Sequence, residues 1–344
     1  MATAKKKKSR TGLYILIVIA CVLLFAAVKV FGPNTGTLRQ GEFLYIHTGS
    51  NYAKLKTQLQ DGGYVSDMSS FNLLAERAQL PAHLHPGKYR IRNGMSNFEI
   101  VRLLRSGRQT PVKLVINKLR TKKDFINLLS TNLEADSNAL HELFRDEHYL
   151  SQFGVDTNTM MCTVIPDTYE FFWNTNADKA YRKIEKNYAH FWDATRKEQA
   201  HIHGCTAVQA TIIASIVDEE TNISEDKPKI ASVYINRLQK GMRLQADPTV
   251  KFAIGDFSIR RVTGEMLRYN SPYNTYQNDG LPPGPICTPS PGTIDAVLQA
   301  PKTSYIYFCA TADLSGHSAF ASSYDEHEKN ATAYRKALNA RGIH

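Results

Sequence analysis

The strongest pattern in the sequence is an unbroken apolar run close to the N-terminus. Residues 12–28 read GLYILIVIACVLLFAAV and include no charged side chain. These 17 residues lie near the lower limit for a membrane-spanning helix, and the run can extend to Phe31 because the Lys29 side chain can snorkel. A cleaved signal peptide is the alternative, although the run is long for one and no small-residue cleavage site ends it. The pattern favours an uncleaved transmembrane helix over 12–31.

After a short linker that contains Pro33 and Gly36, the spacing of apolar positions changes several times over residues 43–116. Short β-type runs predict strands at 43–46, 88–91 and 110–116. Helical spacing predicts helices at 51–60 and 70–78. A capping box of Ser96 with Glu99 opens a further helix. This order predicts a small α+β unit without an obvious catalytic group, so a glycan-binding role and a purely structural role both remain open.

The most informative pattern lies over residues 206–221, where a capping box at Thr206 predicts the start of a helix. At about 100° per residue the apolar side chains fall on one stripe, formed by Ile212, Ile213, Ile216 and Val217. Glu220 falls near the centre of this stripe, Glu219 at its edge and Asp218 roughly opposite.

A carboxylate on an apolar helix face has to be paired, protonated or functional. Burial disfavours the charged form and raises the pKa of the carboxyl group. A raised pKa is what a general acid needs near neutral pH. The alternative is a structural glutamate held by an arginine, and Arg237 and Arg243 are available partners. The helical pattern alone leaves both interpretations of Glu220 open.

The distribution of charge sets the expected orientation in the membrane. The formal net charge is +10, and Lys5 to Lys8 and Arg10 contribute to it. Because basic residues stay on the cytoplasmic side, residues 1–11 are expected to form a cytoplasmic tail and the chain beyond the span is expected to lie outside. A basic protein can also bind nucleic acid. We find neither zinc-finger spacing nor an RNA-binding signature, so nucleic acid is not an expected partner.

The five cysteines form no metal-binding motif. Cys21 lies in the apolar run, and no two of the others form a CxxC pair, which argues against zinc. In an exported domain Cys162, Cys205, Cys287 and Cys309 can pair, and buried free thiols are an equally good interpretation. No metal or cofactor is expected.

The stretches that follow the predicted helix are rich in amides, hydroxyls and aromatic rings. Residues 229–238 have a helical pattern, whereas 241–250, 273–276 and 280–286 are interpreted as loops. Aromatic rings stack on sugar faces, and amides bond hydroxyl and acetamido groups. A Pro- and Gly-rich loop inside a compact domain is commonly functional. These loops favour a carbohydrate site near Glu220.

The order of these motifs resembles the endolytic murein transglycosylases, the YceG-like family. The matching segments are Ala214–Thr221, Ala231–Leu238, Gly241–Thr249, Tyr273–Tyr276, Gly280–Ile286, Pro301–Thr303 and Tyr305–Phe308, followed by Gly316, His317, Phe320 and His327. The resemblance is clear over about 160–330 and weaker elsewhere. Two segments depart from the family pattern: Met160-Met161-Cys162 replaces a common Leu-Glu-Gly, and Asp218-Glu219 replaces a common Glu-Lys pair.

The resemblance implies an α+β fold with an N-terminal single transmembrane helix, a small LysM-like α+β domain over 40–110 and a larger α+β catalytic domain over 111–344. The catalytic glutamate of the family directly precedes a threonine, which makes it Glu220 here. The helical face selects the same residue independently. The residues expected to bind substrate are polar or aromatic positions of the matching motifs, namely Asn236, Arg237, Gln245, Asp247, Thr249, Tyr273, Asn274 and Tyr276.

The implied function is endolytic lytic transglycosylation of peptidoglycan. Such an enzyme cleaves the MurNAc–GlcNAc bond of nascent glycan strands, leaves 1,6-anhydro-MurNAc ends and is expected to terminate strand elongation. One carboxyl group suffices because the C6 hydroxyl attacks its own C1. The expected partners are glycan strands and the cytoplasmic membrane, with peptidoglycan synthases as further candidates. The catalytic domain is expected on the periplasmic or extracytoplasmic side of the inner membrane.

Two other functions remain open from the sequence. A non-catalytic peptidoglycan-binding or scaffold protein would keep Glu220 in a salt bridge. A hydrolase would use Asp247 or Glu219 as a second carboxylate and would leave a reducing end instead of an anhydro end. His317 fits a site residue and a loop histidine equally well.

Overall fold

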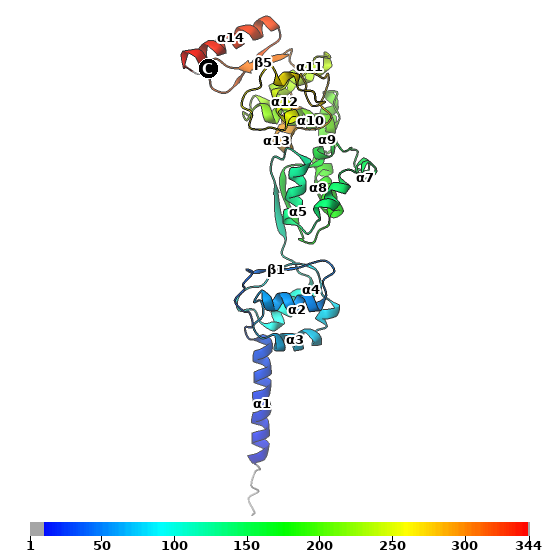
Figure 1. The fold of residues 1–344 in the computed structure, drawn as a ribbon, viewed down its shortest axis with the longest axis vertical. Helices are drawn as coiled ribbons and strands as arrows, with labels where there is room; N and C mark the ends of the chain where they lie inside the picture. The colour runs from blue at the N-terminus through cyan, green and yellow to red at the C-terminus, as the bar shows by residue number, and fades with distance from the viewer. Residues whose placement is uncertain (1–9, 343–344) are drawn as a thin grey trace, which may run out of the picture. The chain divides into compact units, whose positions relative to one another are not determined.

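The structure is a computed structural model that describes residues 10–342. The lysines of the predicted cytoplasmic tail, Lys5 to Lys8, lie outside the described residues. The chain divides into two compact units. The first contains residues up to 112 together with 170–175, and the second contains 113–169 and the chain from 176 onward. Figure 1 labels the elements of each unit.

The helix α1 (Arg10–Phe31) covers the predicted span and begins the first unit. None of its 22 residues is buried, and the helix is long and apolar enough to cross a membrane. The end of α1 is fastened to the unit, because Asn97 Nδ2 donates to the Lys29 carbonyl over 2.9 Å and the Lys29 ammonium pairs with Asp67 at 2.7 Å. The Phe31 ring lies 5.4 Å from the Phe98 ring. Polar and aromatic contacts therefore hold the C-terminal end of α1 against the rest of the first unit.

A two-stranded antiparallel sheet packed on helices forms the rest of the first unit. In the sheet, β1 (Phe43–Ile46) pairs with β2 (Gly87–Arg90), with Phe43 opposite Arg90. The helices are α2 (Tyr52–Asp61), α3 (Met68–Arg77) and α4 (Asn97–Ser106), and a 3-10 turn covers Leu80–Ala82. The predicted capping box of Ser96 and Glu99 is present at the start of α4. The shared core includes Leu44, Ile46, Leu55, Leu59, Phe71, Tyr89, Ile100 and Leu104.

The strand expected at 110–116 does not join this sheet. It forms β3 (Val112–Ile116), which pairs with β4 (Asp167–Phe171), and it belongs largely to the second unit. The apolar spacing predicts that this segment is a strand. It does not predict which strand pairs with it, because pairing depends on contacts with a segment far along the chain.

The second unit is mainly helical with small two-stranded sheets, so the α+β class is confirmed as a mixed α+β fold. Its helices are α5 (Lys122–Asn132), α6 (Ser137–Leu143), α7 (Glu147–Ser151), α8 (Ala177–Phe191), α9 (Ala194–Ile202), α10 (Ala207–Glu220), α11 (Lys227–Gln239), α12 (Asp247–Ile254), α13 (Pro291–Leu298) and α14 (Tyr324–Ala340). Short 3-10 turns cover Met160–Thr163 and Met266–Arg268. Next to these helices, β5 (Tyr307–Ala310) pairs antiparallel with β6 (Ser318–Ala321).

The helix α10 begins as the sequence predicts and runs through the core of the second unit. Thr206 and Gln209 form the capping box at its start. Burial extends beyond the predicted apolar stripe, because residues 210–218 are all buried. Asp218, which the pattern placed on the opposite side, is therefore also inside the protein. The helix is surrounded, and this explains why it has little amphipathic character.

Asp218 is stabilised in the interior by cationic partners. Its carboxylate pairs with Lys118 and with Lys227, each at 2.8 Å, and accepts a hydrogen bond from Thr293. Desolvation raises the pKa of Asp218, but these hydrogen bonds outweigh it and hold the pKa below the ordinary value. Asp218 thus ties α10 to α11 and α13 as an ionised group.

Candidate active site

A pocket of about 390 Å³ lies at the C-terminal end of α10. Its walls come from α10, α11, the start of α12, β5, α14 and nearby loops. The lining residues are Glu220, Tyr234, Arg237, Leu244, Gln245, Asp247, Tyr276, Tyr307, Phe308, Tyr324 and His327. Polar groups and aromatic rings from distant parts of the second unit therefore converge on one glutamate, an arrangement typical of ligand sites.

Glu220 is the last residue of α10. The chain leaves the helix at Thr221 in an extended conformation, with a φ of −147°. The Tyr234 hydroxyl, which comes from α11, donates a hydrogen bond to Glu220 Oε1 over 2.5 Å. No described residue donates to the other carboxyl oxygen, Oε2. One oxygen is thus held by the protein, and the other remains available to a ligand in the pocket.

The surroundings of Glu220 favour its protonated form. Desolvation raises its pKa, the hydrogen bond from Tyr234 lowers it, and the negative charge of Asp247 raises it again. Lys251 and Arg237 act in the lowering direction. Together these effects place the pKa of Glu220 at about 7. Both protonation states are then populated near neutral pH, as general acid–base chemistry requires.

The two arginines that could have held Glu220 in a structural role are engaged elsewhere. Arg237 is buried, and its Nε donates to the Ile306 carbonyl over 2.7 Å. Arg243 pairs with Asp279 at 2.8 Å. Within the described part of the chain, neither forms a salt bridge with Glu220. The geometry therefore does not support an arginine-paired structural glutamate.

Four of the residues predicted to bind substrate line the pocket: Arg237, Gln245, Asp247 and Tyr276. The Tyr276 hydroxyl donates to Asp247 Oδ1 over 2.6 Å. Asp247 opens α12, so the expected loop over 241–250 ends in a helix, and the following Pro248 is a common residue at a helix start. Gln245 has a φ of 50°, which non-glycine residues rarely adopt, and its backbone N–H donates to the Thr275 carbonyl over 3.1 Å.

The other four predicted residues lie outside the lining: Asn236, Thr249, Tyr273 and Asn274. Asn274 is fully buried, and its Nδ2 donates to the carbonyls of Leu267 and Tyr269. Asn236 Nδ2 likewise donates to the carbonyls of Thr303 and Tyr305. Thr249 is fully buried, and Tyr273 packs against the core. The structure thus places these four outside the pocket lining, and the side chains of Asn236, Thr249 and Asn274 donate to backbone carbonyls of the segments that form its walls.

The model of the YceG-like family matches residues 44–333. The chain belongs to the YceG-like family. A crystal structure of a yceG-like protein from Listeria monocytogenes supports the fold of this YceG-like chain. It is 26% identical, has a TM-score of 0.55, and the match covers 83% of this chain and 97% of that one.

Two relatives are named endolytic murein transglycosylase. The protein from Bacillus subtilis is 42% identical over 127 residues, which cover 37% of this chain and 34% of the relative. The protein from Streptococcus pneumoniae is 24% identical over 323 residues, which cover 84% of this YceG-like chain and 57% of the relative. The chain therefore matches about a third of the Bacillus subtilis protein and just over half of the Streptococcus pneumoniae protein.

The pocket of this YceG-like protein also contains residues that were not among those predicted to act in catalysis or to bind substrate: Tyr234, Tyr307, Phe308, Tyr324 and His327. The His327 ring stacks on Tyr307, with the ring centroids 5.1 Å apart. His327 Nδ1 is buried and has no hydrogen-bond partner among the described residues. Several of these positions occur in the family motifs. Only the fold shows that α11, β5 and α14 bring these residues close to Glu220.

Other residues singled out in the sequence lie away from the pocket lining. Glu219 pairs with Arg120 at 3.0 Å and with Lys118 at 3.2 Å. His317 Nδ1 lies 3.2 Å from Asp226 Oδ1. The segment 160–162, which departs from the family pattern, is buried in a 3-10 turn. Glu219 is consequently not a second carboxylate of this pocket, and His317 acts in a loop contact.

The cysteines of the second unit are free thiols in the structure: Cys162, Cys205, Cys287 and Cys309. Burial raises the pKa of Cys162 and of Cys287 far above the ordinary thiol value. Within residues 10–342, no group of histidine, cysteine, aspartate and glutamate side chains has the spacing of a metal site.

Proposed function

We propose that this protein is an endolytic peptidoglycan lytic transglycosylase with Glu220 as its catalytic residue. The observation that carries the proposal is the environment of Glu220, a desolvated carboxyl group with a pKa of about 7 and one oxygen open to a polar pocket. The names of the two relatives support the same activity. The reaction cleaves the MurNAc–GlcNAc bond and leaves a 1,6-anhydro-MurNAc end.

In this reaction Glu220 acts first as an acid and then as a base. The protonated carboxyl group donates its proton to the glycosidic oxygen, and the bond between that oxygen and C1 of MurNAc breaks. The carboxylate then removes the proton of the C6 hydroxyl as O6 forms a bond to C1. Glu220 ends protonated, as it began, and no water is consumed. Intramolecular attack gives O6 a high effective concentration, so a second catalytic carboxylate is not required.

The other pocket residues divide between contact and support in this proposal. Gln245, Asp247 and Tyr276 contact the sugar directly. Asp247 places a negative charge near the oxocarbenium-like transition state and also raises the pKa of Glu220. Arg237 holds β5 and the loop at Leu244 through its guanidinium group, so it shapes the pocket as well as lining it. Four residues outside the lining stabilise the segments that form the pocket walls: Asn236, Thr249, Tyr273 and Asn274.

The proposed cellular arrangement follows from α1 and the family. α1 anchors the protein in the cytoplasmic membrane with residues 1–11 inside and the later residues outside. We assign a LysM-like, glycan-holding domain to 40–110 and the catalytic domain to 111–344. A cut within nascent strands would terminate their elongation, and peptidoglycan synthases are the candidate partners because they supply such strands.

A hydrolase is the second candidate, because Asp247 provides another carboxylate in the same pocket. The two reactions differ in their products. A transglycosylase leaves a non-reducing anhydro end, whereas a hydrolase adds water and leaves a reducing end.

The test is mass spectrometry of purified glycan strands after incubation with the detergent-solubilised full chain and with its Glu220→Gln variant. Anhydro-ended fragments that form only with the unmodified chain are the expected result. Reducing ends would favour the hydrolase. Intact strands with both proteins would favour a binding protein and overturn the proposed activity.

A further inference from the structure

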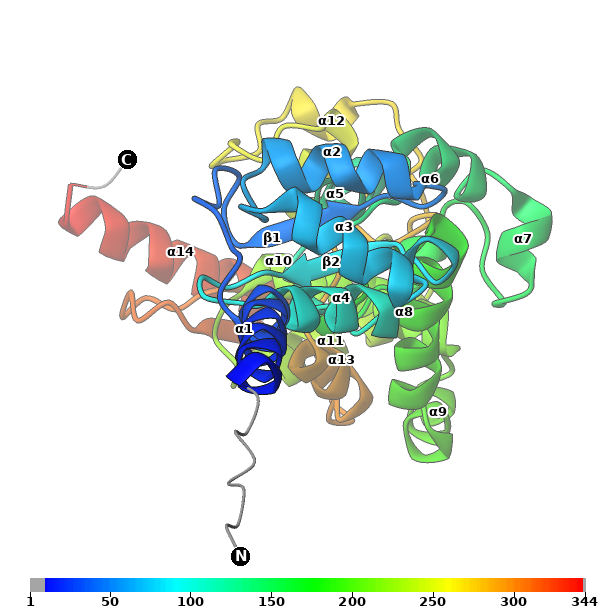
Figure 2. The same cartoon turned by 90° about the horizontal axis from the view of Figure 1, so that it is seen from below.

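The helix α3 lies along the last turns of the apolar helix α1, within the first unit. A groove of about 550 Å³ separates the two helices. It is lined mainly by apolar surface, with Phe25, Ala26 and Val30 on α1 and Leu73 and Leu74 on α3. Figure 2, seen from below, shows α4 next to α1, and α1 also contacts α3.

The length of α1 fixes the depth of this groove in a membrane. The uncharged run over residues 12–28 is about 26 Å long as a helix. The hydrocarbon core of a bilayer is about 30 Å thick, so the whole uncharged run is needed to cross it. Phe25 and Ala26 precede the end of this run at Val28 by about 3–5 Å along the helix axis, and they therefore lie in the outer part of the hydrocarbon core. Because α3 lies beside these two residues, it reaches the boundary between the lipid tails and the headgroups. This step rests on the proposed membrane anchor.

The side chains near this boundary have the character of an interfacial surface. Leu73 exposes 64% of its surface and Phe98 exposes 40%. A second groove, of about 460 Å³, runs between α3 and α4 and is also mostly apolar. An exposed apolar surface of this kind is unusual on a protein face that contacts only water.

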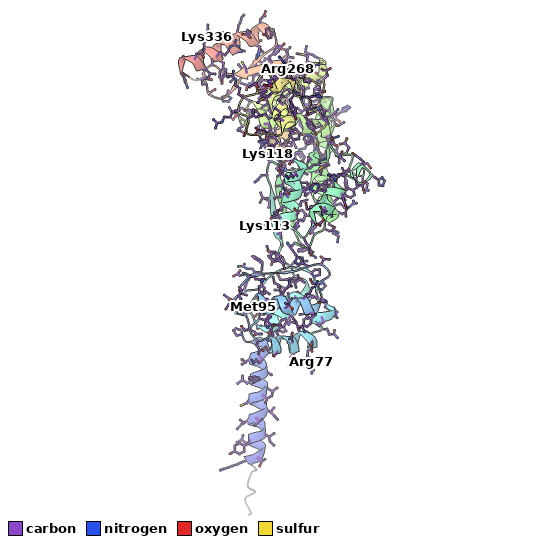
Figure 3. The ribbon with its side chains drawn as sticks, viewed as in Figure 1. Arg77, Met95, Lys113, Lys118, Arg268 and Lys336 are labelled. Atoms are coloured by element: carbon purple, nitrogen blue, oxygen red, sulfur yellow. The ribbon has the colours of Figure 1, made fainter. Side chains whose placement is uncertain are left out.

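Three exposed arginines border the two grooves: Arg77, Arg102 and Arg105. None of the three forms a salt bridge with a described carboxylate. Figure 3 labels Arg77 at the edge of the first unit from which α1 leaves. Guanidinium groups bind phosphate oxygens in a bidentate way, so these arginines are suited to phospholipid headgroups.

We propose that this surface, which we call the α3–α4 surface and define by Leu73, Phe98, Arg77, Arg102 and Arg105, rests in the outer leaflet of the anchoring membrane and binds anionic phospholipid. Leu73 and Phe98 enter the boundary of the acyl chains, and the arginines bind lipid phosphates. The contacts of Lys29 with Asp67 and Asn97 hold α1 against the same unit. The first unit is therefore held at the membrane surface in one orientation and is not suspended from a flexible tether.

The test places a tryptophan on the surface of the full chain in nanodiscs that hold one copy each. The lipids are phosphatidylcholine and phosphatidylglycerol with brominated acyl chains, which quench tryptophan emission on contact. Leu73→Trp is compared with Thr57→Trp, an exposed position on α2 that lines neither groove. The emission of the native tryptophans, measured in the unmodified chain, is subtracted. We expect strong loss of emission for Leu73→Trp and little for Thr57→Trp. Equal loss at both positions would overturn the proposal.

An arginine variant separates the lipid phosphates from the other candidates. Replacing Arg77, Arg102 and Arg105 by glutamine should weaken quenching at position 73, as should leaving out phosphatidylglycerol. Quenching that is unchanged in both cases would overturn the role of the phosphates. A tryptophan at position 73 that is shielded from aqueous acrylamide but not quenched by lipid would point to a covering protein. Shielding only in discs with two copies would identify a second copy of this chain, and either result contradicts the proposal.

A tryptophan within α1 distinguishes failure of the anchor from failure of the surface. Ile17→Trp lies within the apolar run of α1, before the residues that line the groove with α3, and should be quenched whenever α1 spans the bilayer. If Ile17→Trp is quenched and Leu73→Trp is not, the anchor stands and the α3–α4 surface proposal fails. If neither is quenched, the anchor itself is wrong.

Discussion

The Tyr234 hydroxyl and Glu220 Oε1 lie 2.5 Å apart, with the hydroxyl donating from α11 to the end of α10. Tyr234 is buried, and its ring packs edge-on against Phe308 at 6.0 Å. The hydroxyl therefore has a fixed position from which it orients the carboxyl group. It also stabilises the carboxylate and opposes the desolvation that raises the pKa of Glu220. This contact therefore fixes the direction of the proposed catalytic group and limits the rise of its pKa.

Replacing Glu220 by glutamine should remove the activity and leave the fold intact. The amide keeps the size of the side chain but has no carboxyl proton to donate. We expect a loss of about 10²–10⁴-fold in the release of anhydro-ended products, or more because both proton transfers use this residue. The matched control is Glu219→Gln, which changes a neighbouring carboxylate outside the pocket and should retain most of the activity. A folded Glu220→Gln protein that still releases these products at the original rate would rule out the mechanism.

Replacing Tyr234 by phenylalanine should shift the pH dependence of the reaction. The hydroxyl stabilises the ionised form of Glu220, so its loss raises the pKa of Glu220. The acid step needs protonated Glu220, and the alkaline limb of kcat/KM against pH should therefore move upward, by about one unit for one hydrogen bond to a charged group. An alkaline limb that stays in place would show that Tyr234 does not control the protonation of Glu220.

Local chemistry explains which parts of the structure could be predicted from the sequence. Capping boxes at Ser96 and Thr206 satisfy the first amides of α4 and α10, and such bonds depend only on neighbouring residues. The position of Glu220 on α10 follows from helical geometry in the same way. The apolar run of α1 is likewise long enough to be recognised without any tertiary contact.

Residues whose environment depends on distant segments could not be predicted in this way. The partner of β3 and the places of Tyr234 and His327 in the pocket are set by packing between elements far apart in the chain. The amides of Asn236 and Asn274 look like sugar ligands in a sequence, because a buried amide and an exposed one are the same residue type. Only the structure shows that loop carbonyls already accept their hydrogen bonds.

The distinction between wall and lining residues can be tested with Asn274→Ala and Asp247→Asn. Asn274→Ala removes the side-chain donor of the Tyr269 carbonyl, one of two side-chain donors of the Leu267 carbonyl, and the acceptor of the Tyr276 backbone N–H. Each unpaired group costs about 1–3 kcal/mol, so the free energy of unfolding should fall. Asp247→Asn keeps the shape of a lining residue, so it should lower kcat with little change in stability. Urea unfolding and kinetics of both variants decide the matter. A stable Asn274→Ala protein with a raised KM would instead place Asn274 in contact with the substrate.

The raised pKa of Glu220 also predicts a stability effect that depends on pH. The folded protein holds the Glu220 proton up to about pH 7, whereas an unfolded glutamate loses it near its ordinary value of 4.5. Between these two values the folded state binds more protons than the unfolded state, so this group makes the protein less stable as pH rises. Glu220→Gln removes the effect and should gain stability over the original protein between pH 4.5 and 7, by up to about 3 kcal/mol. Parallel unfolding curves at pH 5 and pH 7.5 with an unchanged difference would contradict the raised pKa.

His327 offers a test of substrate contact that does not involve the acid–base residue. Its Nδ1 is buried in the pocket wall and has no hydrogen-bond partner among residues 10–342, although buried polar atoms are usually bonded. Burial and the positive charges of Arg237 and Arg335 lower the pKa of His327, while Glu328 opposes them, so the ring is neutral at neutral pH. A neutral imidazole suits a hydrogen bond with a sugar hydroxyl or acetamido group.

His327→Phe should therefore separate binding from stability. Phenylalanine keeps the stacking on Tyr307, which lies at 5.1 Å and 19°, and removes the unpaired nitrogen. The melting temperature should stay the same or rise, because an unsatisfied buried group costs about 1–3 kcal/mol. If the substrate supplies the missing partner, KM should rise about tenfold, since one hydrogen bond is worth about 1.4 kcal/mol. His201→Phe, an exposed histidine on α9 outside the pocket, is the matched control and should leave KM unchanged. A rise in melting temperature with an unchanged KM would mean that the nitrogen stays unpaired with substrate bound, and His327 would then act only as a packing partner of Tyr307.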